Sequence, residues 1–393
     1  MSLSTVDPAV DHAAVGSETC VACGGAQLEP FLDLGHVPIE TTCLYHTRTE
    51  AVDAPMGRMV LQACPRCGLV RNVAFEPEAV AYTTEYENSQ HFSPTFQRYA
   101  EQLVDRLIET YGLRGGRIAE IGCGKGEFLA LLCERAQARG IGFDPTYDGE
   151  VDASAQHIEI RREFFPGSDG ILDVQLVACR HVLEHVAAPD ELLRTVAESL
   201  PGPGPAYFEV PNASHVFSPS GMWDLIYQHV SYFDARSMWA LFTRCGFDVT
   251  RLAESFRGQF LSLDAVPAEH PAEPMVSRSR DTGRFAATFR HTMDFWERFA
   301  VDNSGRRVVL WGAGAKGVSF LNLTSVGQVV YAAVDVNPRK QGSFVPGTGQ
   351  EVLAPDDLRD DRPDVVLVAN PAYEWEIRSA LSDLGVKPIV TSL

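Results

Sequence analysis

The 393-residue sequence contains no long apolar run and no block of basic residues. No stretch approaches the roughly 20 consecutive apolar residues that a membrane-spanning helix needs. Lysine and arginine total 33 against 52 aspartate and glutamate residues, which gives a formal net charge of −19. An acidic chain without a basic stripe repels nucleic acid at long range. We therefore expect neither nucleic acid nor a membrane as a partner.

The first residues, Met1 to Gly16, have neither the basic start nor the apolar middle of a signal peptide. Cysteine is sparse, with nine residues in the chain, and such usage fits a compartment where thiols stay reduced. These features predict a cytoplasmic protein. The length suits two or three domains.

Changes in composition divide the chain into four segments. Residues 17–80 are rich in Cys, Gly and Pro, whereas 81–265 alternate strand-like and helix-like stretches, as parallel α/β sheets do. Residues 266–304 begin with a Pro-rich linker, Val266–Pro274, and continue with aromatic residues at helical spacing, which predicts a connecting helix. Residues 305–393 restart a βαβ pattern. The aromatic face of the predicted helix consists of Phe285, Phe289, Met293, Trp296 and Phe299.

The first segment carries two Cys-x-x-Cys pairs. Cys20 and Cys23 form the first pair, and Cys64 and Cys67 form the second. Each pair is spaced so that two sulfurs reach one ion, and four thiolates close a tetrahedral zinc site without an open position for water. The pattern therefore predicts a small zinc-binding module in which the metal is structural. The alternative is a pair of redox motifs or cysteines without a common role.

The second segment contains a glycine-rich turn between a strand and a helix. The strand ends at Glu120, glycines follow at three alternate positions, and Glu127–Arg139 is predicted to be helical. A second strand ends at Asp144, where a carboxylate can accept hydrogen bonds from a ribose. Glu120 is the acidic first residue of E-x-G-x-G-x-G, and it suits a cationic aminoacyl tail better than a pyrophosphate. The motif resembles motif I of class I methyltransferases. The predicted S-adenosylmethionine-binding residues are Glu120, Gly122, Cys123, Gly124, Gly126, Asp144 and Pro145.

Further along, His181-Val-Leu-Glu-His185 matches the H-x-x-E-H pattern of some zinc peptidases. A helix that carries two histidine ligands is not expected at the exit of a strand, so we reject that interpretation. His181 either lines the active site or is a buried structural histidine.

Two polar and aromatic stretches, Tyr86–Ser93 and Trp223–Tyr232, are candidates for the acceptor pocket. In the second, Tyr227 and His229 lie in a predicted loop. A histidine can take a proton near neutral pH, as methylation of carbon or of a hydroxyl requires. We predict His229 as the general base and a packed aromatic loop as the alternative. The candidate catalytic residues are His229, Tyr227, His181 and Tyr86.

The order of these parts resembles the deoxysugar C-methyltransferases, which act on nucleotide-linked keto sugars. The resemblance covers nearly the whole chain and implies an α/β fold with a zinc module, a class I methyltransferase domain of Rossmann type, and a C-terminal Rossmann-like domain. It implies a base that removes the proton next to the sugar ketone, followed by attack of the carbanion on the sulfonium methyl. It is carried by the segments Leu32–Pro38, Phe208–Pro211, His229–Phe233, Trp311–Gly317 with Leu321-Asn322, Asp335–Gly342 and Pro346–Thr348.

The chain departs from this family where the chemistry is expected. The family loop Tyr-His-Glu-His is here Ile226, Tyr227, Gln228 and His229, and the family's His-Gly-Gly segment is replaced by Phe256–Gln259. Gln228 cannot titrate, so a carboxylate is missing. O- or N-methylation of a sugar or another polar natural product is therefore an alternative, and a non-catalytic binding module is a third.

The last segment contains Gly312-x-Gly-x-x-Gly317, with Asp335 at the end of the next predicted strand. Taken alone, this pattern is a dinucleotide fingerprint and favours an NAD-dependent half. The resemblance instead implies a domain that helps to hold a nucleotide sugar diphosphate, with Lys316 near it, and a purely structural role is a further alternative. We expect a small-molecule acceptor and a monomer or homodimer.

Overall fold

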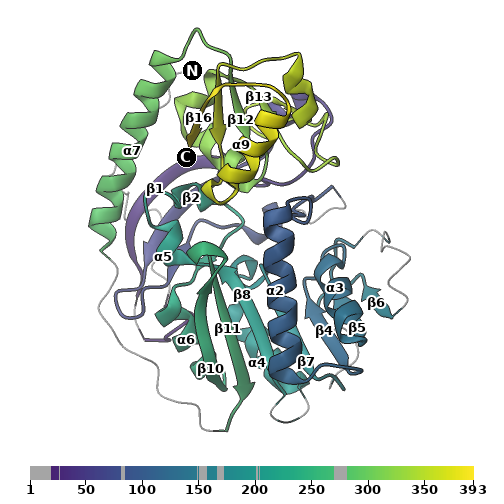
Figure 1. The fold of residues 1–393 in the computed structure, drawn as a ribbon. Helices are drawn as coiled ribbons and strands as arrows, with labels where there is room; N and C mark the ends of the chain where they lie inside the picture. Colours follow the sequence, from purple (N-terminus) through teal and green to yellow (C-terminus); the bar gives the residue numbers. More distant parts are fainter. Residues whose placement is uncertain are drawn as a thin grey trace.

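The computed structural model of the protein describes residues 19–25, 27–80, 85–147, 149, 157–165, 172–200, 202, 204–269 and 281–393. Three β-sheets organise these residues. In Figure 1 the C-terminal sheet and the largest sheet lie at opposite ends of the molecule, with the N-terminal strands between them.

The first sheet is antiparallel and has the order β1-β2-β3-β9. Leu32 and Leu34 of β1 are buried while Asp33 between them is not, which is the alternation of a strand with one face on a core. The strand β9 comes from far along the chain and pairs with β3 through Val70 and Tyr232. The sheet therefore extends beyond the predicted module of residues 17–80, whose boundary stays a prediction. Its elements are β1 (Glu29–Pro38), α1 (Arg48–Val52), β2 (Met56–Ala63), β3 (Val70–Asn72), η1 (Pro77–Ala79) and β9 (Ser231–Tyr232).

The second sheet has seven strands in the order β10-β11-β8-β7-β4-β5-β6. The strands from β8 to β6 run parallel, and β11 is antiparallel to both of its neighbours. The helices α3 (Glu127–Ala136) and α4 (Pro189–Ser199) connect β4 to β5 and β7 to β8, as the alternating pattern predicted. The strands are β4 (Arg117–Ile121), β5 (Arg139–Phe143), β6 (Ile158–Arg161), β7 (Leu176–Arg180), β8 (Ala206–Pro211), β10 (Phe247–Ser255) and β11 (Phe260–Pro267).

Helix boundaries around this sheet follow local capping rules. The Ser93 side chain accepts hydrogen bonds from the backbone of Thr95 and Phe96 at the start of α2, and Gly112 ends the helix at φ +62°. The helix α3 ends at Ala136, earlier than predicted, because Arg139 already begins β5. The remaining elements are α2 (Pro94–Tyr111), α3 (Glu127–Ala136), η2 (Leu183–His185), α4 (Pro189–Ser199), α5 (Ala213–Val216), η3 (Met222–Asp224), α6 (Ala235–Arg244) and η4 (Phe256–Gly258).

The third sheet is wholly parallel, with the order β14-β13-β12-β15-β16, and forms a Rossmann-like unit. Its strands are continuous apolar runs because helices and loops cover both faces. The elements are β12 (Val308–Trp311), α8 (Ala315–Leu323), η5 (Ser325–Gln328), β13 (Val330–Val334), β14 (Glu351–Leu353), η6 (Pro355–Arg359), β15 (Val365–Val368), η7 (Pro371–Tyr373), α9 (Glu374–Asp383) and β16 (Ile389–Ser392).

A long helix, α7 (Thr282–Asp302), joins the second sheet to the third and runs along one side of the molecule (Figure 1). Phe285, Phe289 and Trp296 are buried, which confirms the predicted packing face. The predicted linker is partly wrong, because Val266 and Pro267 still pair with β10, whereas residues 270–280 lie outside the described residues.

One apolar core joins the first sheet to the C-terminal unit. It contains Leu32 and Met59 of the first sheet, Trp223 of the loop after β8, and Leu310 and Phe320 of the C-terminal unit. Because these parts share a core, they hold each other in place. In the portion of the chain that the structure describes, no helix is both long and apolar enough to cross a membrane.

Candidate active site

The site lies where the order of the largest sheet reverses. The strand β4 lies between β5 and β7, so the loops that leave β4 and β7 diverge at the carboxyl edge of the sheet. Such a point is the usual ligand crevice of a doubly wound sheet.

Three glycines shape the loop after β4. Gly122 has φ +66°, and a Cβ there would come within 2.1 Å of Val182 in the loop after β7. Gly124 has φ +54°, and a Cβ there would meet open space, so its backbone is accessible to a ligand. Gly126 has φ +80° and is the residue directly before α3. The predicted glycine turn thus has the close approach and left-handed backbone that require glycine.

Glu120, on β4, is a buried carboxyl that lacks a countercharge of its own. It is 3% exposed, and its Oε2 has no hydrogen-bond partner. Burial raises the pKa of Glu120 to about 8, although the positive charge of Arg180 lowers it in part. A cationic ammonium or sulfonium group would relieve this arrangement. The observation fits the aminoacyl tail of S-adenosylmethionine.

Asp144 follows β5 and faces the glycine loop. Its Oδ2 accepts a hydrogen bond from the Gly124 backbone at 2.7 Å, and its Oδ1 accepts hydrogen bonds from the backbone and hydroxyl of Thr146 at 2.8 and 2.6 Å. A carboxylate has about four lone-pair positions, so Asp144 retains capacity for a ribose hydroxyl. Pro145 is half-buried beside it, and burial raises the pKa of the nearby Cys123 thiol.

Two histidines and one carboxylate form a cluster next to η2, the short helix after β7. A carboxylate oxygen of Glu184 and one ring nitrogen each of His185 and His229 all lie within 4.8 Å of one another. The rings of His185 and His229 meet edge to face at 4.9 Å between centroids. His229 is 7% exposed, and burial lowers its pKa well below the ordinary value. The predicted base therefore lies in a cluster whose other members come from a different element, η2.

His181 lies between this cluster and the sheet. It has φ +55°, a left-handed backbone that a non-glycine residue adopts at a cost of order 1–3 kcal/mol. Its Nδ1 is 3.8 Å from Glu184 Oε1, and its Nε2 is 3.3 Å from Glu209 Oε1. Phe260 packs against its ring at 4.5 Å. The predicted site residue thus bridges two carboxylates. Because His181 follows β7 directly and no helix begins before η2, the structure agrees with the rejection of the zinc-peptidase pattern.

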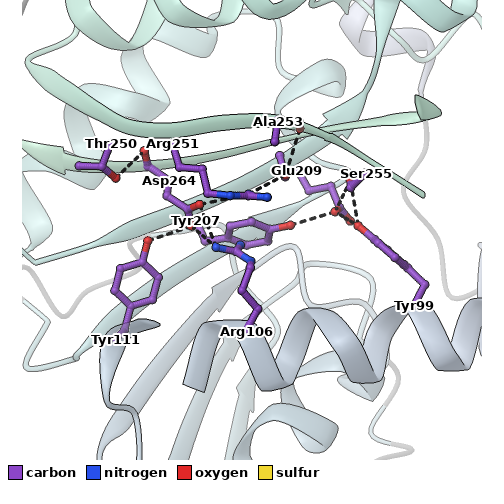
Figure 2. A network of polar contacts seen from close by, with 11 residues as sticks. Tyr99, Arg106, Tyr111, Tyr207, Glu209, Thr250, Arg251, Ala253, Ser255 and Asp264 are labelled. Atoms are coloured by element: carbon purple, nitrogen blue, oxygen red, sulfur yellow. Dashed lines mark hydrogen bonds and ion pairs between the residues drawn. The ribbon is translucent and has the colours of Figure 1, made fainter. Parts of the chain in front are cut away.

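Glu209 is the centre of a buried polar network on β8 (Figure 2). Arg180 donates to its Oε1 at 3.1 and 2.9 Å, and the hydroxyls of Tyr207 and Tyr99 donate to Oε2. Burial opposes the charge, but Arg180 and these donors hold the pKa of Glu209 below its ordinary value. On the neighbouring strand, Asp264 accepts hydrogen bonds from Arg106, Tyr111 and Arg251. The network fixes Arg180 and His181 at the edge of the crevice.

The two predicted tyrosines lie in different places. The partly buried Tyr86 lies near the crevice, and burial together with the charges of Glu184 and Asp144 raises its pKa. Tyr227 instead packs on the first sheet, where its hydroxyl accepts from the backbone of Glu76 at 3.0 Å and its ring covers Gly57. The structure therefore brings Tyr86, His181 and His229 to one side of the crevice and does not bring the Tyr227 hydroxyl there.

A buried carboxylate that sequence reasoning missed ties the cofactor loop to the C-terminal unit. Glu87 is 2% exposed and lies 3.4 Å from Lys125 Nζ in the glycine loop. Its Oε1 accepts from Asn337 Nδ2 at 3.0 Å, and its Oε2 is 3.4 Å from Arg339. The only sequence signal was its position in the polar stretch 86–93.

A left-handed turn replaces the family's His-Gly-Gly segment. Phe256, Arg257 and Gly258 have φ values of +43°, +58° and +82°. The next residue, Gln259, exchanges two side-chain hydrogen bonds of 2.9 and 3.0 Å with Asn370 of the C-terminal unit. The turn is thus another contact between the largest sheet and the C-terminal unit.

Residues of the N-terminal segment and of the C-terminal unit pack beside the C-terminal glycine fingerprint. Asp335 accepts hydrogen bonds from the backbone of Ala313 and Asn337, both at 2.9 Å. Residues 41–44 and 343–346 line the space beside Ala313 and leave a cavity of about 10 Å³, room for one water at most. This geometry favours a packing role over dinucleotide binding. The nearby Lys316 forms an ion pair with Asp224, which belongs to the stretch Trp223–Tyr232.

The four predicted metal ligands come together. The sulfurs of Cys20, Cys23, Cys64 and Cys67 all lie within 4.8 Å of one another. Backbone hydrogen bonds from Gly24 to Cys20 and from Gly68 to Cys64 close the two knuckles. The cluster is compatible with a tetrahedral metal site.

Several solved methyltransferase structures are similar to part of the chain. One is the 1,6-didemethyltoxoflavin-N1-methyltransferase of Burkholderia thailandensis with bound S-adenosylhomocysteine, which is 15% identical, with a TM-score of 0.38 over 45% of this chain and 82% of that chain. Another is the magnesium protoporphyrin IX methyltransferase of Synechocystis, also with bound S-adenosylhomocysteine, which is 17% identical, with a TM-score of 0.37 over 47% of this chain and 91% of that chain.

Two family models match along the chain. Residues 92–252 match a methyltransferase domain, and residues 284–388 match a C-methyltransferase C-terminal domain. The C-methyltransferase NovU of Streptomyces niveus is 25% identical over 391 residues, which cover 92% of this chain and 91% of that protein. These matches, with the strand order and the glycine loop described above, confirm the predicted fold class. The chain thus carries a methyltransferase domain followed by a C-methyltransferase C-terminal domain, and it is an S-adenosylmethionine-dependent methyltransferase.

Proposed function

We propose that this C-methyltransferase methylates the carbon next to the ketone of a nucleotide-linked deoxysugar, with His229 as the general base. The observation that supports this most directly is the placement of His229. It is a neutral, buried imidazole in a cluster that adjoins the glycine loop through Val182 and Gly122. A neutral imidazole is the form that removes a proton.

The cofactor would be held by the loop after β4 and the carboxylate after β5. Glu120 would face the cationic aminoacyl tail, Gly124 would allow close approach, and Asp144 would accept from the ribose. When bound there, S-adenosylmethionine supplies the methyl group. Closure of the crevice around both reactants would contribute much of the acceleration through proximity.

On the acceptor, His229 would take the proton from carbon while the electron pair of the C–H bond moves into the enolate. The partly buried Tyr86 would stabilise the enolate oxygen, because burial keeps its hydroxyl protonated and able to donate. Lys316 at the start of α8, whose positive charge acts on His229, would suit the anionic diphosphate that stays attached to the sugar. Tyr227, whose hydroxyl lies on the first sheet, has no part in this proposal.

We further propose that the four cysteines hold a structural zinc ion. Four thiolates at these separations leave no open coordination position, so the ion would stabilise the fold and take no part in the reaction.

A deuterium-exchange experiment tests the base separately from methyl transfer. Nucleotide-linked 4-keto and 3-keto deoxysugars are incubated in D₂O with enzyme and S-adenosylhomocysteine, and exchange next to the ketone is followed by NMR. We expect exchange with the wild type, a loss of roughly 100-fold or more in His229→Ala, and normal exchange in His291→Ala, which removes an exposed histidine of α7.

Methyl transfer is then followed with S-adenosylmethionine that carries a ¹³C methyl group. Label on a ring carbon next to the ketone supports the proposal. Label on oxygen or nitrogen contradicts C-methylation of the sugar, and cofactor binding without any labelled sugar contradicts the acceptor class.

A further inference from the structure

The carboxylate of Glu184 has no hydrogen-bond partner although it is almost completely buried. It is 2% exposed, and both of its oxygens lack a partner, as do the Nδ1 atoms of His185 and His229 beside it. A buried polar group left without a partner costs about 1–3 kcal/mol, and a charged group costs more. Such groups are few in native proteins, and each one calls for an explanation such as a catalytic role.

Burial shifts the pKa of the carboxyl group upward and the pKa values of the two imidazoles downward. Burial, with the charge of Glu209 adding to it, raises the pKa of Glu184 to about 8, although the residue's own backbone N–H dipole lowers it in part. Burial lowers the pKa of His185 to about 4 and that of His229 well below its ordinary value. Near neutral pH the cluster therefore carries one ionisable proton, on the carboxyl group, beside two uncharged imidazoles.

His185 links the two sides of this cluster. Its Nδ1 has no hydrogen-bond partner, and its ring packs edge to face on the His229 ring at 4.9 Å between centroids. This contact joins η2 to the loop that carries His229. Glu184 and His229 therefore lie side by side although they are far apart in the sequence.

We propose that Glu184 is the positioning carboxylate of His229 and takes the role of the carboxylate that Gln228 cannot provide. The ionised Glu184 accepts a hydrogen bond from one ring nitrogen of His229, which leaves the other nitrogen bare toward the acceptor. The inference rests on the proposed function of His229 as the base.

His229 and Glu184 together accept the proton that leaves the acceptor carbon. The acceptor C–H bond breaks, its electron pair enters the enolate, and the proton forms an N–H bond on the bare nitrogen of His229. The N–H proton on the other side of the ring passes to Glu184 and forms an O–H bond. The site thereby avoids an unpaired imidazolium, which burial makes costly. A protonated Glu184 holds the opposite tautomer, so the active form appears as pH rises through the pKa of the carboxyl group.

Other charged and titratable groups surround the pair. They lie on different elements, and each contacts His229 or Glu184 or acts on one of them through its charge. They are His181 after β7, His185 on η2, Glu209 on β8, Tyr86 from the segment before α2, Tyr232 on β9 and Lys316 on α8.

NMR of the free, full-length protein tests the pairing without an acceptor. Protein labelled with ¹⁵N-histidine is titrated from about pH 5.5 to 9.5, His229 is assigned with His229→Gln, and its tautomer is read from long-range ¹H–¹⁵N correlations. We expect the tautomer to change with a midpoint near pH 8, to stay constant in Glu184→Gln, and to change again in Glu184→Asp. Glu198→Gln, on an exposed position of α4, should behave as the wild type. A constant tautomer in the wild type, or the same midpoint in Glu184→Gln, would overturn the proposal.

The turnover of Glu184→Gln separates this inference from the proposed function. We expect kcat to fall roughly 100-fold with little change in KM, and the acid limb of the pH profile to move to lower pH, because a lone His229 titrates below neutrality. A merely structural role would lower the rate without moving the limb. If His229→Ala loses deuterium exchange while Glu184→Gln keeps the wild-type rate and profile, this inference fails alone. If His229→Ala retains exchange, the proposed function fails first.

Discussion

Replacement of Glu120 by glutamine is expected to stabilise the protein without cofactor and to weaken cofactor binding. The two effects have one cause. Glu120 is 3% exposed, and burial raises its pKa to about 8 from an ordinary value of 4.5. Glutamine has nearly the same shape but never has to ionise.

The sign of the stability effect follows from the direction of the pKa shift. A carboxyl whose pKa is raised in the folded state stabilises the fold below its unfolded pKa, and this contribution is lost as pH rises toward the folded pKa. Each pH unit in that window changes the free energy of unfolding by about 1.4 kcal/mol. Between about pH 5.5 and pH 8 the stability of Glu120→Gln relative to the wild type should therefore increase by about 3 kcal/mol.

The binding effect is read as proton release. At about pH 6.5 nearly all of Glu120 is protonated without cofactor and ionised beside the cationic tail, so about one proton should leave per cofactor bound. Calorimetry in two buffers with different ionisation enthalpies measures this number. In Glu120→Gln it should fall to near zero, and affinity should fall by about 10- to 150-fold, since a hydrogen bond to a charged group contributes about 1.5–3 kcal/mol.

Glu134→Gln, on an exposed position of α3, is the matched control and should leave both measurements unchanged. The reasoning is refuted if the wild type binds S-adenosylmethionine without releasing a proton, or if Glu120→Gln binds and unfolds as the wild type does at every pH.

Three further predictions concern the metal, a buried ion pair and the C-terminal unit. The purified protein should contain about one zinc ion per chain by mass spectrometry, and Cys64→Ser should lose it while Cys43→Ser keeps it. Arg180→Met leaves the buried Glu209 without its partner and should lower the free energy of unfolding by about 3–5 kcal/mol, whereas Arg194→Met, which breaks an exposed pair with Asp190, should change it by less than about 1 kcal/mol in urea denaturation. NADH should show no saturable binding by fluorescence at about millimolar concentration, because the protein fills the crevice beside Ala313; saturable binding would contradict that assignment.

Local patterns predicted the parts of the site that are formed by neighbours in the sequence. The glycines after Glu120 have positive φ because the chain turns from strand to helix within a few residues, and Asp144 follows the adjacent strand. The cysteine pairs likewise depend on short loops and on the number of thiolates that zinc accepts. In each case spacing along the chain determines spacing in the structure.

Other features depend on which distant segments meet, and the sequence carried no local sign of them. Glu184 lies three residues after His181, in a pattern that matches a metal site of zinc peptidases. Its burial beside His229 depends on the distant loop after β8. Tyr227 and His229 are two residues apart, yet their side chains diverge, because the tyrosine ring packs over Gly57. Glu87 acquires its partners from the C-terminal unit.

The strand β9 has a consequence for how this enzyme could be recombined with its relatives. The loop that carries His229 continues into β9, and Asn72 of the first sheet donates its backbone N–H to Val230 and its side-chain amide to the carbonyl of Tyr227. The N-terminal strands thus hold the backbone of the loop that carries His229, although they precede the methyltransferase domain in the chain. A chimera that exchanges residues 19–80 alone would separate this loop from the strands that support it. One that exchanges residues 213–233 together with them would keep the loop and its supporting strands matched.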